Sequence, residues 1–467
     1  MELTFTKSNQ GKDKLSYQGH FYVFDKKNAT GERSYWRCEN LKNCRARLHL
    51  RVEDNALLKL VNEHSHFPIP GRKEVLDKIH SMKEDARLRP QKRPREIVSS
   101  IGDLHESQQA QLSSLHSQTQ RIQRIKRANV DSIPIPNDTN FDLPHKYTFL
   151  EDGQTSMLLW DSGKEDTKRI ILFATQKTLN CLKSVRHAFT DSTFKSSPNV
   201  FYQTWALHGL FGATTVPLVI GFTSNKTEES YGRIYSKIKE AVPEFSPDSM
   251  LLDMENANIN AIRRHFPAAE VKICLFHVAQ ACFRQVQALG LLQAYVGRPE
   301  VAEFIRKFPT LAFVPQHRVK EYYDMLLQNM PQDVEGIDAF IHYFEDRYVE
   351  KRGNRPADIP INMWNMYDRV NANLPRSNNA IESWHSQVNL MIACSNPTFW
   401  KALSFLQTEF KIQETKLNAL IRGEAFRQKR EDKENEEKIR ELVHQFGERE
   451  ADEYLRVLSY RISKFRR

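Results

Sequence analysis

Short runs of aromatic and β-branched residues, separated by Gly or Asn, mark the first part of the chain. They cover residues 21–24, 34–37 and 46–50, and such runs between turn residues are typical of β-strands. Two prolines and a glycine follow at positions 68, 70 and 71. We therefore expect a small β-rich domain over residues 1–70.

A polar stretch with helical spacing follows in residues 72–130, interrupted by two prolines. Near its end, Ile122 and Ile125 lie among four cations, which predicts a basic helix. Residues 132–144 contain three prolines and are typical of a linker. We expect a basic helical region and linker over residues 71–144.

Apolar runs of strand length alternate with helical patterns from residue 145 onward. The predicted strands are residues 170–173, 185–191, 201–210, 214–222, 250–252 and 271–276, and the predicted helices include 227–241 and 257–265. From residue 185 the order is β-β-β-α-β-α-β-α, which is the order of a ribonuclease H-like sheet.

Helical patterns dominate the remainder. Residues 278–375 look like a helical insertion, residues 378–422 are helical again, and residues 424–440 predict a charged helix. The predicted fold class is therefore α+β, with a ribonuclease H-like mixed-sheet core over residues 145–422 that carries the insertion. A charged helical tail over residues 423–467 completes the expected organisation.

The charge of the chain is uneven. The 467 residues have a formal net charge of +10, and residues 1–130 contain 25 Lys and Arg against 15 Asp and Glu. A basic N-terminal part suits a polyanion-binding module on a neutral core, although a merely solvated basic surface fits the charge equally well. The basic cluster at residues 89–95 resembles a nuclear localisation signal, so we expect a nuclear protein.

Cysteine content and hydropathy argue against a disulfide-rich protein and against a membrane-spanning protein. Six cysteines do not make a disulfide framework in a chain of this length. No apolar run reaches the length of a membrane span, and the first ten residues are polar and unlike a signal peptide. We expect an intracellular protein with no membrane partner.

Four residues of the β-rich part have the chemistry of a zinc site. Cys38 and Cys44 precede His64 and His66, and two thiolates with two imidazoles satisfy tetrahedral zinc. One residue separates the two histidines, so an extended backbone projects both rings to the same side. Unconnected cysteines and an incidental surface histidine pair are the alternative. A domain this small usually needs such a ligand to fold, which favours Zn²⁺.

Three acidic residues lie in separate apolar or helical surroundings. Asp191 lies in AFTDSTFK, Asp253 in MLLDMENAN and Glu382 in SNNAIESWH. Paired divalent metals for phosphodiester chemistry need carboxylates that converge from separate elements. Each residue alone is equally explained as a turn, a strand-end cap or a solvated helix position.

The N-terminal residues resemble a known zinc-binding family. Phe5, Leu15, Tyr22, Trp36, Cys38 and His64 occur in the order that names the FLYWCH zinc finger, over roughly residues 3–67, and the stretch at residues 8–12 is also similar. The resemblance implies binding to DNA or protein. Arg45, Arg47 and Arg51 are the candidate phosphate contacts, with a solvated strand face as the alternative.

The core resembles the Mutator-like (MULE) transposases from about residue 145 to about residue 420. The motifs TDSTFKSSP, PLVIGFTSNKTEESY, LLDMENANINAIRRHFP, CLFH and NNAIESWH occur in that family's order. The resemblance implies that Asp191, Asp253 and Glu382 form a catalytic triad that holds two Mg²⁺ or Mn²⁺ ions. Glu255 is a competing carboxylate close to Asp253.

Three further residues are candidates for accessory or structural roles. Cys274 and His277 form a C-x-x-H motif, and His385 lies one helical turn after Glu382. A zinc site at the motif would need two more ligands, so we favour a buried cysteine and a hydrogen-bonded histidine. His385 could contact a scissile phosphate.

The function that these patterns favour is a DNA transposase that binds double-stranded DNA at element ends, cuts it and joins it. One alternative is a domesticated DNA-binding or transcription-regulatory protein derived from a transposase. Another is a ribonuclease H-like nuclease without strand transfer. The sequence leaves homo-oligomerisation open.

Overall fold

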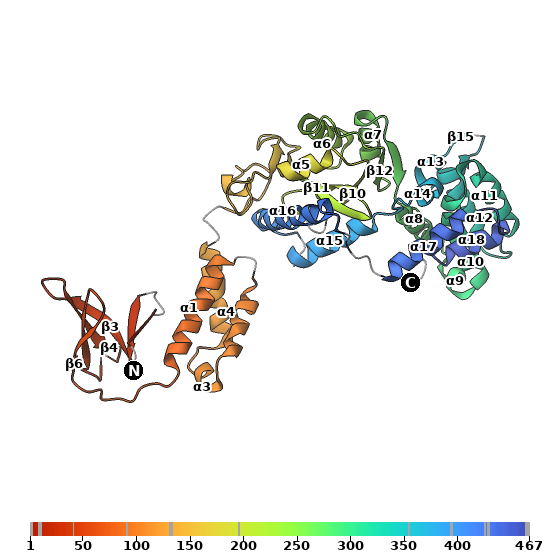
Figure 1. Ribbon diagram of the computed structural model, residues 1–467. Helices are drawn as coiled ribbons and strands as arrows, with labels where there is room; N and C mark the ends of the chain where they lie inside the picture. The colour runs from red at the N-terminus through yellow and green to blue at the C-terminus, as the bar shows by residue number, and fades with distance from the viewer. Residues whose placement is uncertain are drawn as a thin grey trace. The chain divides into compact units, whose positions relative to one another are not determined.

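The computed structural model describes residues 3–7, 12–40, 42–89, 92–129, 134–194, 197–353, 355–392, 396–424, 426 and 430–462. The stretch at residues 8–11 and residues 90–91 of the basic cluster lie outside them. The chain forms two compact units, Met1–Pro134 and Ile135–Arg467 (Figure 1).

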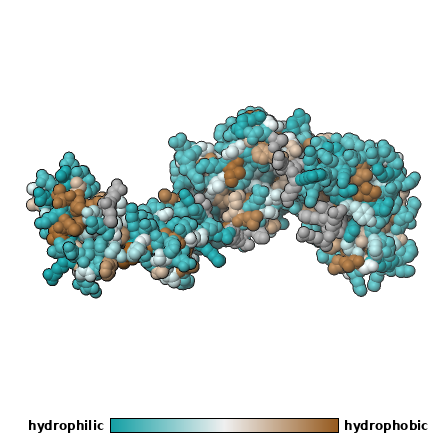
Figure 2. Space-filling view, turned by 60° about the horizontal axis from the view of Figure 1, so that its bottom comes forward, coloured by the Kyte–Doolittle hydropathy of each residue, from teal (hydrophilic) through white to brown (hydrophobic). Residues whose placement is uncertain are grey.

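The N-terminal unit begins with a six-stranded antiparallel sheet in which every strand pairs with the next one along the chain. Its strands are β1 (Thr4–Lys7), β2 (Asp13–Tyr17), β3 (His20–Lys27), β4 (Arg33–Cys38), β5 (Arg47–Arg51) and β6 (Leu57–Val61). Alternate residues point to one face and form the core, namely Leu15, Tyr22, Trp36, Leu48 and Leu50. Phe5, Phe24 and Leu60 lie on this same face, opposite Leu15, Trp36 and Leu48, but are partly exposed, so the surface of this domain carries hydrophobic areas (Figure 2).

Four helices complete the first unit. They are α1 (Arg72–Leu88), α2 (Pro94–Ser99), α3 (Glu106–Gln109) and α4 (Leu115–Asn129). Pro94 begins α2, a position where its missing N–H costs nothing. The basic helix predicted near residue 121 is confirmed as α4, which packs Ile122 against Ile79 and Ile97 among other apolar residues.

A seven-stranded mixed sheet forms the centre of the second unit, in the order β13-β12-β9-β10-β11-β8-β7. Its strands are β7 (Leu158–Asp161), β8 (Ile170–Phe173), β9 (His187–Thr193), β10 (Gln203–Phe211), β11 (Thr214–Thr223), β12 (Ser249–Leu252) and β13 (Glu270–Ile273). Strands β9, β10 and β11 form an antiparallel meander, whereas β12 runs parallel to both β9 and β13. The strand and helix order predicted from residue 185 is confirmed.

Helices cover both faces of this sheet. Figure 1 shows α5 (Gln176–Leu182), α6 (Glu228–Ala241) and α7 (Asn256–His265) on one face. The other face is covered by α15 (Asn379–Ile392) and α16 (Phe399–Ile421). The strand expected over residues 271–276 was wrong at its end, because β13 ends at Ile273 and α8 (Leu275–Ala288) begins two residues later.

The segment between β13 and α15 is mostly helical, as expected. After α8 it contains α9 (Leu292–Gly297), α10 (Pro299–Lys307), α11 (Val319–Gln328), α12 (Ile337–Phe344), α13 (Ile361–Trp364) and α14 (Tyr367–Asn371), with a small hairpin of β14 (Glu350–Lys351) and β15 (Arg355–Pro356). No helix in the described part of the chain is long and apolar enough to cross a membrane.

The C-terminal helices pack on this insertion. The charged helix expected at residues 424–440 is α17 (Arg430–His444), and α18 (Ala451–Ser459) follows it. The Tyr454 hydroxyl donates a 2.7 Å hydrogen bond to the carbonyl of Phe313, and Lys307 forms a 2.8 Å ion pair with Asp452. Helix α18 is thus part of the folded second unit.

Part of the segment expected as a linker is held against the second unit by hydrogen bonds. Residues 134–144 form neither helix nor strand, yet the buried Arg169 donates hydrogen bonds of 2.7 and 2.8 Å to the carbonyls of Thr139 and Phe141. The same guanidinium forms a two-pronged ion pair with Asp161.

Candidate metal centre and carboxylate pocket

The four predicted zinc ligands converge at one end of the N-terminal sheet. Cys38 lies at the end of β4, Cys44 follows in the next turn, and His64 and His66 follow β6. Their ligand atoms all lie within 4.8 Å of one another. Sγ of Cys38 is 3.2 Å from Nε2 of His66, and Sγ of Cys44 is 3.3 Å from Nδ1 of His64. Tetrahedral zinc requires a sulfur–nitrogen separation of about 3.6 Å, so the donor set fits Zn²⁺.

Groups around the four ligands orient them. Nε2 of His64 lies 2.7 Å from the Tyr22 hydroxyl, and Nδ1 of His66 lies 3.1 Å from the carbonyl of Phe67. Each imidazole therefore turns its other nitrogen toward a cysteine, which is the usual arrangement around zinc. Burial raises the pKa of the Cys44 thiol, but backbone N–H groups and its neighbours outweigh that effect and lower it to about 7. A thiol of this kind is readily deprotonated for metal binding.

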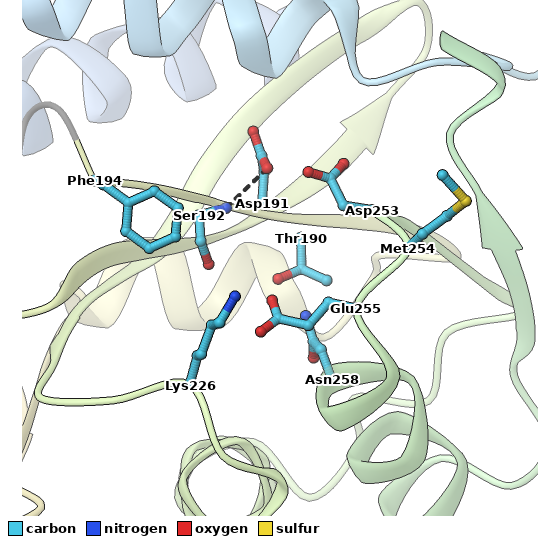
Figure 3. A pocket seen from close by; sticks show the side chains of 9 residues that line it. All are labelled: Thr190, Asp191, Ser192, Phe194, Lys226, Asp253, Met254, Glu255 and Asn258. Carbon is cyan, nitrogen blue, oxygen red and sulfur yellow. Dashed lines mark hydrogen bonds between the residues drawn. The ribbon is translucent and has the colours of Figure 1, made fainter. Parts of the chain in front are cut away.

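A pocket opens where β9 and β12 end. These strands are parallel neighbours, with Phe189 opposite Leu251, so their carboxyl ends meet at one edge of the sheet. Asp191 lies near the end of β9, and Asp253 directly follows β12. The cavity has a volume of about 220 Å³ and is lined by Thr190, Asp191, Ser192, Phe194, Lys226, Asp253, Met254, Glu255 and Asn258 (Figure 3).

Three of these side chains are carboxylates, and two have perturbed acidity. Burial raises the pKa of Asp191, and the negative charge of Asp253 raises it further. Burial also raises the pKa of Glu255, with added repulsion from both aspartates. The Glu255 carboxylate accepts a 2.9 Å hydrogen bond from the buried Tyr231 hydroxyl. Concentrated negative charge with poor hydration is the environment that a divalent cation stabilises.

A histidine lies against each aspartate. Nε2 of His385 is 3.1 Å from Oδ2 of Asp191, and Nδ1 of His277 is 2.8 Å from Oδ1 of Asp253. Neither ring N–H is aligned for a regular hydrogen bond, so both are close electrostatic contacts. Burial lowers the pKa of His277, but the contact with Asp253 outweighs it and raises the pKa to about 10.

The C-x-x-H motif joins the second aspartate to helix α15. Its histidine, His277, contacts Asp253, and the fully buried Sγ of Cys274 accepts a 3.2 Å hydrogen bond from the backbone N–H of Asn378. The Asn378 side chain donates in turn to Asp253 at 3.2 Å. Cys274 and His277 belong to no tight group of three metal ligands in the described residues, where the cysteine–histidine cluster of the first unit is the one group found.

Glu382 lies on α15, as predicted, but is not among the residues that line the pocket. Asn378 directly precedes α15, and Glu382 and His385 follow it at i+4 and i+7, a spacing that places the three residues along one side of the helix. The first contacts Asp253 and the last contacts Asp191. Glu382 therefore lies on the helix face turned toward the two aspartates.

Buried polar contacts fix α15 on its other side. Nε1 of Trp384 donates a 2.6 Å hydrogen bond to Oε1 of Glu409, a residue of α16 that is only 2% exposed. The side chain of Gln413 donates to the same oxygen. Sequence reasoning missed Glu409, because an isolated glutamate in a long helix looks like a solvated one.

The predicted DNA contacts lie on the exposed face of the N-terminal sheet. Arg47 pairs with Arg37 across β5 and β4, and Arg51 pairs with Arg33, so four guanidinium groups share one face. Arg47 forms a 3.0 Å ion pair with Asp25, and Arg51 forms one of 3.2 Å with Asp54. Arg45 precedes β5 and is exposed.

The first unit thus contains a β-domain with a cluster of two cysteines and two histidines, and the second contains a mixed sheet with a carboxylate pocket. Comparison with family models agrees with both. Residues 5–66 match the FLYWCH zinc finger domain, and residues 188–281 match the MULE transposase domain. The chain therefore contains one segment similar to a FLYWCH zinc finger and a second segment similar to a MULE transposase domain.

Two curated relatives from Caenorhabditis elegans share a short stretch with this chain. FLYWCH transcription factor 2 is 31% identical over 55 residues, which is 12% of this chain and 12% of that protein. FLYWCH transcription factor 1 is 34% identical over 53 residues, which is 11% of this chain and 10% of that protein. The similarity to each thus covers about a tenth of its length.

Proposed function

We propose that this chain is a DNA transposase that binds double-stranded DNA through its N-terminal unit and cuts phosphodiester bonds at the carboxylate pocket. The observation that carries the proposal is the pair Asp191 and Asp253. They come from neighbouring parallel strands, share one cavity, and lie within the residues that match the MULE transposase domain. The strand order 13-12-9-10-11 supports a ribonuclease H-like sheet, in which such a pair belongs to the catalytic centre.

The residues of the pocket fit a hard divalent cation. Asp191 and Asp253 offer oxygen ligands, and the raised pKa of Asp191 reflects its burial and the nearby negative charge of Asp253. Bound Mg²⁺ or Mn²⁺ would activate the attacking hydroxyl and stabilise the leaving oxygen. Glu382 is the proposed third carboxylate, because its helix face is turned toward both aspartates.

The remaining residues hold this geometry. His277 and Asn378 fix the orientation of Asp253, and His385 fixes Asp191. In the cutting step, water oxygen forms a bond to phosphorus while the bond from phosphorus to the 3′-oxygen of the DNA breaks. The water proton passes to solvent, and the 3′-oxygen leaves with the bonding electrons. Strand joining is the same displacement with a DNA 3′-hydroxyl as the nucleophile.

The N-terminal unit supplies the proposed DNA contacts. Arg33, Arg37, Arg47 and Arg51 share the exposed face of the N-terminal sheet, and Arg45 lies beside it. Contacts from such cations to phosphates release counterions, so the binding should weaken steeply with salt. Binding to DNA also supports a nuclear location.

A second candidate function is a regulatory DNA-binding protein that no longer cuts DNA. Its support is that both curated relatives carry the name of a FLYWCH transcription factor. This function needs the finger and does not need the carboxylate pocket.

A cleavage assay separates the two functions. The full chain is incubated with genomic DNA from the flanks of its own coding sequence, in Mg²⁺, in Mn²⁺ or in Ca²⁺. The transposase proposal predicts cutting in Mg²⁺ or Mn²⁺ that Asp191→Asn abolishes, whereas Asp338→Asn, an exposed residue of α12, cuts like the wild type. If tightly bound DNA stays uncut in every metal, the regulatory function is the one supported.

A further inference from the structure

Two aromatic side chains are exposed beside the carboxylate pocket. Phe194 follows β9 and is 51% exposed, and Tyr202 precedes β10 and is 49% exposed. Strands β9 and β10 pair at Thr193 and Thr204, which brings the two rings to the same end of the sheet. Their ring centroids are 5.2 Å apart in an edge-to-face arrangement.

The position of this pair distinguishes it from ordinary exposed apolar residues. Single surface hydrophobics are common and need no explanation. Among the large hydrophobic residues that are exposed in the described parts of the chain, Phe194 is the one that lines the pocket of Asp191 and Asp253. An edge-to-face pair also leaves ring surface open to a third flat group.

A cation lies next to the aromatic pair. Nζ of Lys226 is 5.9 Å from the centroid of the Phe194 ring, and Lys226 lines the same pocket (Figure 3). The rim of one cavity therefore offers an aromatic surface, a positive charge for a phosphate, and carboxylates for a metal. A nucleotide has the matching parts, which are a flat base and an anionic phosphate, and base–aromatic stacking accepts any base.

We propose that Phe194 and Tyr202 form a stacking platform for an unpaired nucleobase of the DNA strand whose phosphate lies in the carboxylate pocket. The inference rests on the proposed function and adds to it a requirement for local unpairing. A base next to the cut must leave the duplex to reach the platform, and the stacking offsets part of the cost of unpairing. A mispaired or bulged base is then the preferred ligand, because less base pairing is lost.

The test uses the full-length protein and a short duplex with a single bulged 2-aminopurine, in Ca²⁺ so that binding is read without cutting. Wild type should bind the bulged duplex more tightly than the fully paired duplex and quench the 2-aminopurine fluorescence. Phe194→Ala and Tyr202→Ala should each lose the quenching and weaken bulge binding about tenfold. Their binding to fully paired DNA should stay unchanged, because the finger contacts remain.

Two matched variants complete the experiment. Tyr202→Phe retains the ring and should behave like the wild type. Tyr460→Ala removes a residue of similar exposure, 48%, just after α18, and should also have no effect. Circular dichroism of each alanine variant should match that of the wild type, which checks that the variant folds.

Equal binding of bulged and paired duplexes by the wild type overturns the proposal, and so does unchanged quenching in Phe194→Ala. A change of oligomeric state in Phe194→Ala would instead identify the surface as a protein contact and also overturn it. Failure of the platform and failure of the proposed function are distinguishable. If the protein stacks the base but never cuts DNA, the transposase function is refuted. If the protein cuts DNA without stacking the base, only the platform is refuted.

Discussion

Glu409 is the residue whose removal should most directly loosen the helix that faces the aspartates. Its buried carboxyl oxygen accepts hydrogen bonds from Trp384 on α15 and from Gln413 on its own helix. Glu409→Ala leaves two buried donors without a partner, at about 1–3 kcal/mol each. The variant no longer has to bury a carboxyl group, which offsets part of this cost. We therefore expect the free energy of unfolding to fall by about 3 kcal/mol.

The measurable effect follows from the size of the second unit. The unfolding entropy of a unit spanning Ile135–Arg467 converts 3 kcal/mol into a fall in Tm of about 4 °C. Differential scanning calorimetry should show that fall in the transition of the second unit only. DNA cleavage should fall with it, because Glu382 and His385 lie on the loosened helix.

Two variants control for this reasoning. Glu409→Gln retains an acceptor oxygen and should lose much less stability. Glu441→Ala removes an exposed glutamate of α17 and should leave Tm unchanged. If Glu409→Ala unfolds at the temperature of the wild type, Glu409 does not hold α15 in place and the reasoning is refuted.

Other predictions concern the metal sites and the anchored segment. Cys38→Ser or a chelator should unfold the β-domain with loss of about one zinc per chain, and an unchanged circular dichroism spectrum of the N-terminal unit after metal removal would contradict this. Arg47→Ala should reduce the salt dependence of DNA binding by about one phosphate contact, seen as a shallower slope of log affinity against log salt. Because the native pKa of Asp191 is raised, the folded state holds its proton more tightly, and the stability of metal-free protein falls as pH rises through the window between the ordinary and the raised pKa. Asp191→Asn should therefore raise the Tm of metal-free protein, by more at the upper end of that window than below it. Arg169→Ala breaks a buried ion pair and should cost about 3–5 kcal/mol, measured by denaturant unfolding.

Continuous apolar runs made the central strands predictable. Strand β8 consists of four buried residues, and β12 is equally buried, so hydrophobicity alone indicates both. The same signal misplaced one boundary. Ile273 precedes Cys274 and Leu275 and Phe276 follow it, so apolar residues continue across the change from β13 to α8 and hydropathy does not mark it. The sequence analysis missed β7, because this strand is short and only half-buried and so gives no long apolar run.

The zinc ligands were predictable because they come in close pairs with recognisable chemistry. The contacts that orient the aspartates were not, because they join residues far apart in the chain. Asn378 reaches Asp253 across 125 positions, and the backbone of the same residue reaches Cys274 across 104. The exposed pair of Phe194 and Tyr202 depends likewise on the register of β9 and β10, which local pattern does not reveal.

Anomalous diffraction from crystals grown with Mn²⁺ tests the central proposal most directly. The account predicts manganese bound by Asp191 and Asp253 in the cavity at the ends of β9 and β12, with a second ion about 4 Å away when DNA is bound. Glu382 should complete the ligand set, and Asp191→Asn should abolish the signal. Wild-type crystals with no manganese at either aspartate would contradict the account, and manganese held by Glu255 in place of Glu382 would reassign the third carboxylate.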